Sequence, residues 1–202
     1  MISGIILAAG KSSRMGQDKL SLMLHGRPLL EHVILAAKNS ILLETIVVWG
    51  SYGNSRQLAE LHGLRAVENK NYEKGLSTSL MTGIKAICPD SKAVMFLLGD
   101  MPYIDAKIIN RLIHTYHRNE KGIIVPLYEG QRGNPVLFSR EYEMDLCGVQ
   151  GDMGARQLIE KYKEDVAWVP FHKGKWNRDI DTIEAYDLAK KGDEDGDEKG
   201  KA

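Results

Sequence analysis

The chain alternates between short apolar runs and segments in which apolar residues recur at helical spacing. The apolar runs are bounded by glycine or polar residues and are too short for typical helices, so they predict buried strands. The predicted strands lie at 4–9, 45–49, 64–67, 93–98, 123–127, 136–138 and 166–169, with a short extended piece at 22–24. The run 93–98 has no polar residue, which is typical of a strand covered on both faces.

Between these strands, the polar positions predict helices. Pro28 is suited to a helix start, Asp105 to capping a helix with an apolar stripe, and a serine near 77 to capping the helix that follows it. The predicted helices lie at 28–37, 54–61, 77–87, 106–116, 140–146, 153–162 and 183–190. Alternating strands and helices indicate an α/β fold, a Rossmann-like three-layer sandwich. Its sheet would have about seven mostly parallel strands, helices on both faces and antiparallel additions at one edge.

We expect one domain over residues 1–191, because no repeat and no linker divides the chain. Residues 192–202 are charged and glycine-rich, which predicts a disordered tail. The 27 basic and 27 acidic residues balance, which argues against nucleic-acid binding. No apolar stretch is long enough for a membrane span, and the first apolar run is too short for a signal peptide. Cys88 and Cys147 have no metal-type spacing, so we expect reduced thiols in a cytoplasmic enzyme.

The first predicted strand leads into a loop that carries glycine and three cations, Lys11, Arg14 and Lys19. Such loops hold phosphate well, because bare backbone N–H groups can approach the anion. A P-loop is not the explanation: Gly10-Lys11-Ser12 matches its second half, but Ile5 occupies the place of its first glycine. A dinucleotide-binding G-x-G-x-x-G is also absent from this loop. A nucleotide is therefore expected here, bound in another way.

A second polar signal, Gly99-Asp100, follows the strand at 93–98. Ligands of α/β sheets bind beyond the carboxyl ends of the strands, so the two signals would share a site if their strands are neighbours. A carboxylate beside polyphosphate would be repelled unless a divalent cation lay between them. Mg²⁺ suits this role, because it uses few protein carboxylates together with substrate phosphates.

The stretch Leu7-Ala-Ala-Gly-Lys-Ser-Ser-Arg-Met-Gly-Gln-Asp-Lys19 resembles the nucleotidyltransferase signature L-A-[AG]-G-x-[SG]-x-R-M-G. Four further pieces fit the same resemblance: 75–80 (GLSTSL), 99–102 (GDMP), 133–138 (GNPVLF) and 151–156 (GDMGAR). Together they resemble the molybdenum cofactor cytidylyltransferase family, within the MobA-like NTP transferases. The resemblance covers residues 2–188 and implies the nucleotidyltransferase fold, which is similar to that of GT-A enzymes.

The resemblance implies a Mg²⁺-dependent transfer of CMP from CTP to the terminal phosphate of Mo-molybdopterin, with release of pyrophosphate. Ala9 favours CTP, because the guanylyltransferases carry L-A-G-G where this chain has L-A-A-G. A molybdenum hydroxylase of the xanthine dehydrogenase type is the implied client. Two alternatives stay open: a transferase that uses GTP or another phosphorylated acceptor, and a non-catalytic carrier of the finished cofactor.

The resemblance also assigns roles to residues. Arg14, Lys19 and Asp100 are the catalytic candidates, and Asp100 and Asp181 are the metal ligands, with Asp179 as a further candidate. The nucleotide-binding candidates are Leu7, Ala8, Ala9, Gly10, Lys11, Ser12, Ser13, Arg14, Lys19, Ser77 and Ser79. The candidates on the molybdopterin side are Asn134, Gly151, Asp152, Gly154 and Arg156.

Several of these residues have a purely structural alternative. Asp100 could cap a helix started by Pro102, and Asp181 could cap the last helix through the capping box Asp181-Thr-Ile-Glu184. Ser77 or Ser79 could be an N-cap, and Asp152 could cap the helix that follows it.

Overall fold

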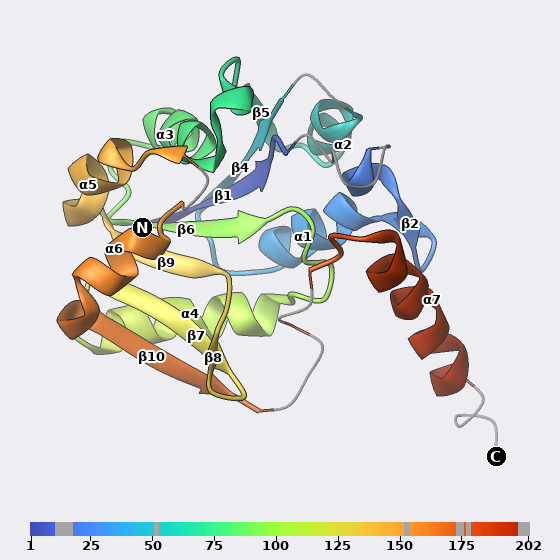
Figure 1. Cartoon of the computed structure of the whole chain (residues 1–202). Helices are drawn as coiled ribbons and strands as arrows, with labels where there is room; N and C mark the ends of the chain where they lie inside the picture. The colour runs from blue at the N-terminus through green and yellow to red at the C-terminus, as the bar shows by residue number, and fades with distance from the viewer. Residues whose placement is uncertain (11–17, 51–52, 152–153, 173–175, 177–178, 198–202) are drawn as a thin grey trace.

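A computed structural model describes residues 1–10, 18–50, 53–151, 154–172, 176 and 179–197 (Figure 1). The strands are β1 (Ile2–Ala8), β2 (Met23–Leu24), β3 (Arg27–Pro28), β4 (Glu44–Trp49), β5 (Arg65–Glu68), β6 (Ala93–Leu98), β7 (Ile123–Tyr128), β8 (Gln131–Arg132), β9 (Val136–Ser139) and β10 (Val166–Phe171). The α-helices are α1 (Leu29–Lys38), α2 (Ser55–Leu61), α3 (Leu76–Ala86), α4 (Ala106–Arg118), α5 (Glu143–Gly148), α6 (Arg156–Lys161) and α7 (Ile183–Asp197). Short 3₁₀ turns include η1 (Lys19–Ser21) and η2 (Tyr72–Lys74).

An 8-stranded sheet forms the centre, in the order β10-β7-β9-β6-β1-β4-β5, with β8 paired to β7. β1 is parallel to both β4 and β6, and β4 is parallel to β5. This mostly parallel sheet confirms the predicted fold class. The chain moves outward from β1 through β4 to β5 and then returns to β6 on the other side of β1. The strand order therefore reverses between β1 and β6, where α/β sheets bind their ligands.

The predicted position of the antiparallel strand is wrong. β9 lies inside the sheet, antiparallel to β6 on one side and to β7 on the other. All four residues of β9 are buried, and its apolar sequence Val136-Leu-Phe138 suits a strand with neighbours on both sides. The turn after β7 reverses the chain: Glu129 and Gly130 have φ values of 53° and 80°, and β8 then pairs back onto β7.

Two apolar cores cover the two faces of the sheet, as the alternation along β1 requires. Ile2 and Ile6 pack into a core with residues of α1, α2 and α4. Ile5 and Leu7 pack into the core on the other face, with residues of α3, α5 and α6. A Cβ at Gly83 would lie 2.6 Å from Ile5 Cγ2, so this glycine lets α3 lie directly on β1.

The helix boundaries differ from the predictions at several places, of which three concern a predicted cap, start or end. α3 has Gly75 as its N-cap, with φ 105°, and no side chain caps it, so neither Ser77 nor Ser79 is the cap. α6 begins at Arg156, later than the predicted start at Met153, a residue outside the described part of the chain. α7 continues to Asp197, beyond the predicted end near Lys190. The domain boundary at residue 191 stays a prediction.

Within the described residues, no helix is both long and apolar enough to cross a membrane. The cysteines Cys88 and Cys147 are both free thiols, as expected.

Candidate active site

A cavity of about 500 Å³ lies at the carboxyl ends of β1 and β6, where the strand order reverses. Leu7 and Leu98, which line it, are paired neighbours in the two strands. The two polar signals at Gly10 and Asp100 therefore meet in one site, as the sequence predicted. The lining residues are Leu7, Ala9, Gly10, Lys19, Leu20, Tyr72, Glu73, Gly75, Leu76, Ser79, Leu98, Asp100, Asp179 and Asp181.

Lys19 joins the two predicted metal ligands. Its Nζ lies 2.6 Å from Asp100 Oδ2 and 2.5 Å from Asp181 Oδ1. The Lys19 side chain is only 13% exposed. Burial by itself lowers the pKa of Lys19, but the attraction of Asp100 and Asp181 outweighs this effect and leaves the pKa raised. Lys19 is therefore a stable cation at the centre of the site.

Local structure holds Lys19 in place. Asp18 caps the 3₁₀ turn η1 by accepting a hydrogen bond from Leu20 N at 3.2 Å, and its other carboxylate oxygen accepts one from Ser21. The Leu20 side chain is buried in the core below the turn. Gly53, with φ 77°, lies against Asp18, and a Cβ there would come within 2.0 Å of Asp18 Oδ2. The turn that carries Lys19 is thus fixed by a cap and by close contact with the loop after β4.

Asp100 does not cap a helix. The helix after it, α4, begins at Ala106 and is capped by Asp105, which accepts a hydrogen bond from Ile108 N at 2.9 Å. One oxygen of Asp100 pairs with Lys19, while the other, Oδ1, is buried and has no hydrogen-bond partner in the described part of the chain. A buried carboxylate oxygen without a partner is costly, and active sites retain such groups for ligands.

Asp181 does not cap a helix either. Thr182 is the residue that caps α7, because its Oγ1 accepts a hydrogen bond from Ala185 N at 3.1 Å. The residue three positions after this cap is Ala185, which has no side chain that could complete a capping box, so the predicted box Asp181–Glu184 does not form. This leaves the Asp181 carboxylate to the cavity, where it pairs with Lys19.

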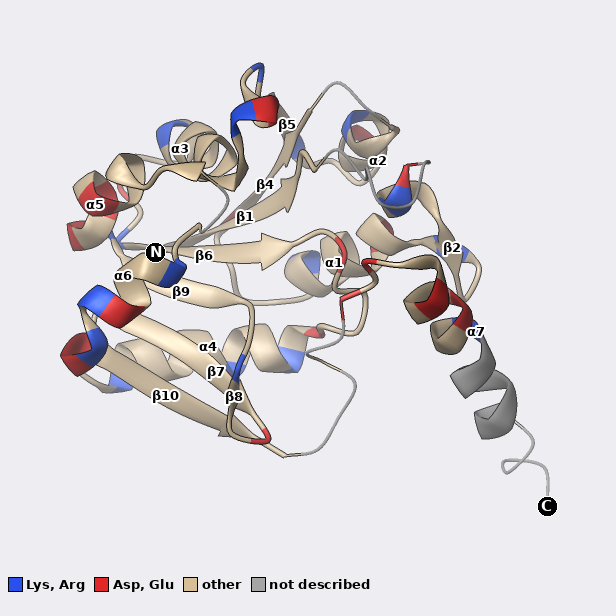
Figure 2. Cartoon of the chain, viewed as in Figure 1, with Lys and Arg blue, Asp and Glu red and all other residues tan. Residues whose placement is uncertain are grey.

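The segment before α7 places two carboxylates side by side at the cavity. Ile180 N donates to Asp100 O at 3.1 Å, and the Ile180 side chain is buried with Leu24 and Leu29. Asp179 and Asp181, on either side of it, both line the cavity. Partial burial and the neighbouring charges of Asp181 and Asp100 raise the pKa of Asp179. In Figure 2, the central strands carry few charged positions, whereas acidic positions lie in the loops after β6 and before α7.

Carboxylate oxygens are hard donors that suit a divalent cation such as Mg²⁺. Asp100 Oδ1 fits this role, because it is buried and otherwise unsatisfied. Among the described residues, no group of three or more Asp, Glu, His or Cys side chains is arranged to hold a metal alone. The donor set therefore fits a metal that also takes ligands from water or phosphate, as Mg²⁺ usually does.

The opposite wall of the cavity comes from the segment between β5 and α3. Tyr72 packs against Gly50, where a Cβ would lie 3.0 Å from Tyr72 Cγ and 3.2 Å from Ala9 O. Leu76 and Ser79 continue this wall on the first turns of α3. The sequence prediction missed Tyr72, Glu73 and Leu76. An aromatic residue in a polar loop just before a helix start was the available signal for Tyr72.

Not all predicted site residues reach the cavity. Leu7, Ala9, Gly10, Lys19, Ser79, Asp100 and Asp181 line it, whereas Ala8 and Ser77 are buried and are not among its lining residues. Lys11, Ser12, Ser13, Arg14 and Asp152 lie outside the described residues. Their roles stay predictions.

Among the residues predicted for the molybdopterin side, the four that the structure describes, Asn134, Gly151, Gly154 and Arg156, do not line this cavity. Asn134 accepts a hydrogen bond from Tyr128 OH through its carbonyl at 2.8 Å, and Arg156 is exposed at the start of α6. Gly154, with φ 54°, lies close to Leu76 of the cavity wall, since a Cβ there would lie 2.8 Å from Leu76 Cδ2.

The fold and site together are those of an α/β enzyme that handles a nucleotide at the reversal of its strand order. Residues 4–166 match the model of the MobA-like NTP transferase domain, and the chain belongs to this family. It is a nucleotidyltransferase.

Individual relatives agree with this assignment. The molybdenum cofactor cytidylyltransferase of Escherichia coli (strain K12) is 30% identical over 193 residues, which cover 94% of this chain and 95% of the relative. A probable molybdenum cofactor guanylyltransferase of Thermococcus sibiricus is 29% identical over 141 residues, 69% of each chain. The crystal structure of Rv0371c from Mycobacterium tuberculosis H37Rv matches the fold with a TM-score of 0.83 at 24% identity, over 94% of this chain and 97% of that one.

Proposed function

We propose that this protein transfers CMP from CTP to the terminal phosphate of Mo-molybdopterin and thereby forms the cytosine dinucleotide cofactor. The observation that carries the proposal is the cavity in which Lys19 joins Asp100 and Asp181, while Asp100 Oδ1 is buried without a partner in the described chain. A phosphate-handling site needs a fixed cation, and it needs carboxylates only if a metal accompanies the phosphates. Both requirements are met at one place.

In the proposed reaction, an oxygen of the molybdopterin phosphate attacks the α-phosphorus of CTP. The bond between that phosphorus and the oxygen bridging to the β-phosphate breaks, and pyrophosphate leaves. Such transfers depend on positioning and on neutralising charge more than on covalent help from the protein. Lys19 provides positive charge to the phosphates. The backbone at Gly10 is open to them on the side of the described residues, none of which lies within 4 Å of its Cβ position.

Mg²⁺ is the proposed cofactor, with Asp100 and Asp181 as the residues that hold it. When bound, it would neutralise charge on the phosphates. Lys19 already bridges one oxygen of each carboxylate, so the ammonium and the metal share the same two side chains. Arg14, outside the described residues, is proposed as a second cation for the triphosphate.

The nucleotide is proposed to lie between the end of β1 and the wall formed by Tyr72, Leu76 and Ser79. Ala9 lines the cavity, which supports a part in choosing the base. The proposed acceptor side includes Asn134, Gly151, Asp152, Gly154 and Arg156. The contact of Gly154 with Leu76 supports this arrangement, because it connects that turn to the cavity wall.

The test is a panel of the four nucleoside triphosphates with Mo-molybdopterin and Mg²⁺, with pyrophosphate release as the readout. We expect release with CTP, and only when both the cofactor and the metal are present. Equal release with GTP would remove the argument from Ala9 and favour the guanylyl alternative. Tight binding of cofactor without pyrophosphate release from any triphosphate would overturn the transferase in favour of a carrier.

A further inference from the structure

Asn69, which follows β5, is buried at 2% exposure and connects three segments around the cavity. Its backbone N–H donates to Trp49 O at the end of β4 at 2.8 Å, and its carbonyl accepts from Tyr72 N at 3.3 Å. Its side chain reaches Thr78 and Ser79 in α3. This one residue therefore ties the end of β4, the turn that carries Tyr72 and the start of α3.

The direction of the Asn69 side-chain bonds follows from chemistry alone. Oδ1 lies 3.0 Å from Asn71 N, and a backbone N–H can only donate, so this side-chain atom must be the oxygen. Nδ2 then faces Thr78 Oγ1 at 2.8 Å and Ser79 Oγ at 2.9 Å. An amide nitrogen only donates, so both hydroxyl oxygens act as acceptors here.

The two hydroxyl groups differ in where their own protons go. Thr78 Oγ1 has protein acceptors, Asn71 O at 3.0 Å and Gly75 O at 2.9 Å. For Ser79, the described part of the chain provides no such acceptor, and the bond from Asn69 is the side-chain hydrogen bond it makes. Gly75 O, one turn earlier, already accepts from both the backbone and the side chain of Thr78. Ser79 lines the cavity, so its proton is left for a ligand there.

We propose that Asn69 is a positioning residue that makes the Ser79 hydroxyl a hydrogen-bond donor to the bound nucleotide. The inference rests on the proposed function, since it assumes that a nucleotide occupies this cavity. By donating to Ser79 Oγ, Asn69 turns the serine proton away from itself. The nucleotide must then present an acceptor, which is a base carbonyl, an unprotonated ring nitrogen or a ribose oxygen.

The most direct test reverses the direction of the two hydrogen bonds that Asn69 Nδ2 donates while keeping their geometry. In Asn69→Asp, the carboxylate can accept from Asn71 N, Thr78 and Ser79 together, so all three partners stay bonded. The Ser79 proton is then drawn toward position 69, and lone pairs face the nucleotide. We expect the Kd for CTP to rise about tenfold in N69D and about fivefold in Ser79→Ala, measured by isothermal titration calorimetry with Mg²⁺.

The double variant separates positioning from other effects. If Asn69 acts through Ser79, adding N69D to S79A raises the Kd much less than N69D does in the wild type, because no hydroxyl remains to be turned. A charge effect through space, or a general loss of structure, would instead add fully in both backgrounds and would overturn the inference. An S79A variant that binds CTP as tightly as the wild type would overturn it as well.

Thr78→Val is the matched control, because it removes the other hydroxyl that Asn69 contacts, one that has acceptors in the protein. We expect T78V to lower the melting temperature and to leave the Kd for CTP within about twofold of the wild-type value. A T78V variant that lost as much affinity as S79A would contradict a specific role for Ser79.

Repeating the S79A titration with 2′-deoxy-CTP tests whether the acceptor is the 2′-oxygen of the ribose. A penalty that persists places the acceptor on the base or elsewhere on the nucleotide, and a penalty that disappears places it on the 2′-oxygen; both support the inference. A wild-type chain that binds none of the four triphosphates would overturn the proposed function itself, which is a different result from CTP binding that is insensitive to Ser79.

Discussion

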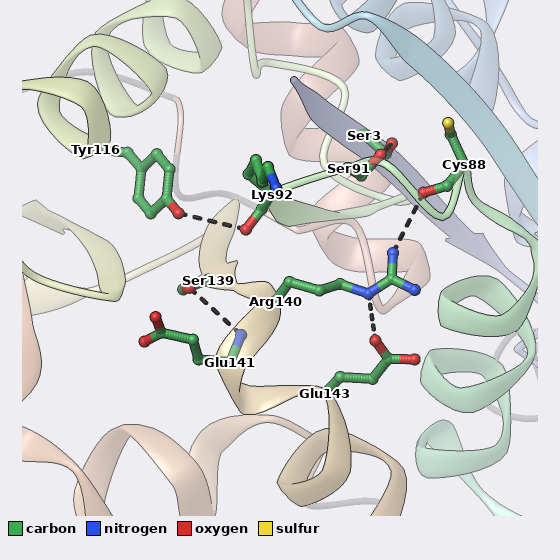
Figure 3. A network of polar contacts seen from close by, with 9 residues as sticks. All are labelled: Ser3, Cys88, Ser91, Lys92, Tyr116, Ser139, Arg140, Glu141 and Glu143. Carbon is green, nitrogen blue, oxygen red and sulfur yellow. Dashed lines mark hydrogen bonds and ion pairs between the residues drawn. The ribbon is translucent and has the colours of Figure 1, made fainter.

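Polar side chains lie at both ends of the strands in the central sheet, but the two ends differ in whether these side chains have hydrogen-bond partners. At the amino ends of the strands, Ser3 is hydrogen-bonded to Ser91 and donates to Glu44 Oε1 at 2.6 Å. The same Glu44 oxygen accepts from Cys88 N at 2.5 Å. Nearby, Arg140 donates to Cys88 O at 3.3 Å and pairs with Glu143 (Figure 3). These polar groups satisfy one another.

At the carboxyl ends, the described residues place more carboxylates than cations in the cavity and leave one carboxylate oxygen without a hydrogen-bond partner. Three carboxylates, those of Asp100, Asp179 and Asp181, line one cavity with Lys19. Asp100 Oδ1 is buried without a hydrogen-bond partner in the part of the chain that the structure describes. The pKa of Asp179 is raised by partial burial and by its acidic neighbours. Unlike the amino ends, this end has a buried carboxylate oxygen for which the described residues supply no partner.

Because of this difference, substitutions at the two ends can separate effects on stability from effects on function. Satisfied polar networks hold loops together, so breaking them should cost stability. Unsatisfied and mutually repelling groups cost stability as they stand, and they persist where a ligand compensates them. Substitutions at the two ends should therefore have opposite signatures.

The largest effect is expected from Asp100→Asn. Activity should fall about a thousandfold, because the amide keeps the shape but removes the charge of the proposed metal ligand. The free energy of unfolding should change by less than about 1 kcal/mol, since Lys19 keeps Asp181 as a partner. Pyrophosphate release and chemical denaturation measure the two quantities. A large loss of stability in D100N would mean that Asp100 has a structural role, which would contradict the proposed difference between the two ends of the sheet.

Lys19→Met is expected to lower activity about a hundredfold, because it removes the cation and keeps much of the aliphatic stem. It should also leave the carboxylates of Asp100 and Asp181 without their shared partner. Mg²⁺ should then raise the melting temperature of K19M more than that of the wild type, as differential scanning fluorimetry would detect. Equal shifts in the two proteins would mean that the ammonium and the metal do not share these carboxylates.

Asp181→Asn should lower activity about tenfold to a hundredfold, with little change in stability, because Thr182 caps α7. Thr182→Ala is its matched control. Loss of that cap should cost about 1 kcal/mol of stability and leave pyrophosphate release close to the wild-type rate. If D181N lost stability and T182A did not, the result would support Asp181, and not Thr182, as the cap of α7.

Glu44→Ala tests the amino end and should have no catalytic effect. It removes the acceptor of Ser3 and Cys88 N, so the free energy of unfolding should fall by about 1–3 kcal/mol. The rate of pyrophosphate release, measured well below the melting temperature, should match the wild type. A Glu44→Ala enzyme with normal stability and impaired turnover would contradict the division between the two ends.

Local patterns in the sequence were enough to predict most elements of the fold. The unbroken apolar run at β6 and the Asp105 cap of α4 appear as predicted, because burial on both faces and capping depend on neighbouring residues. The residue Ile5, where a P-loop needs glycine, argued against that motif, which depends on local spacing. The chain belongs instead to the MobA-like NTP transferase family. Predictions failed where two local signals were close together, as at Asp181 and Thr182.

The amino-acid pattern predicted most of the strands and helices, together with the glycine and acidic residues that follow β1 and β6; the strands β3 and β8 were not predicted. Which of these residues lie together depends on the tertiary structure. Lys19 is separated by 81 positions from Asp100 and by 162 from Asp181, and the strand order brings all three together. Likewise, the pattern did not reveal that β9 enters the sheet between β6 and β7, or that Ser79 and not Ser77 lines the cavity. Hydrophobic periodicity records which face of an element is buried, whereas the neighbour across that face depends on how the whole chain crosses over.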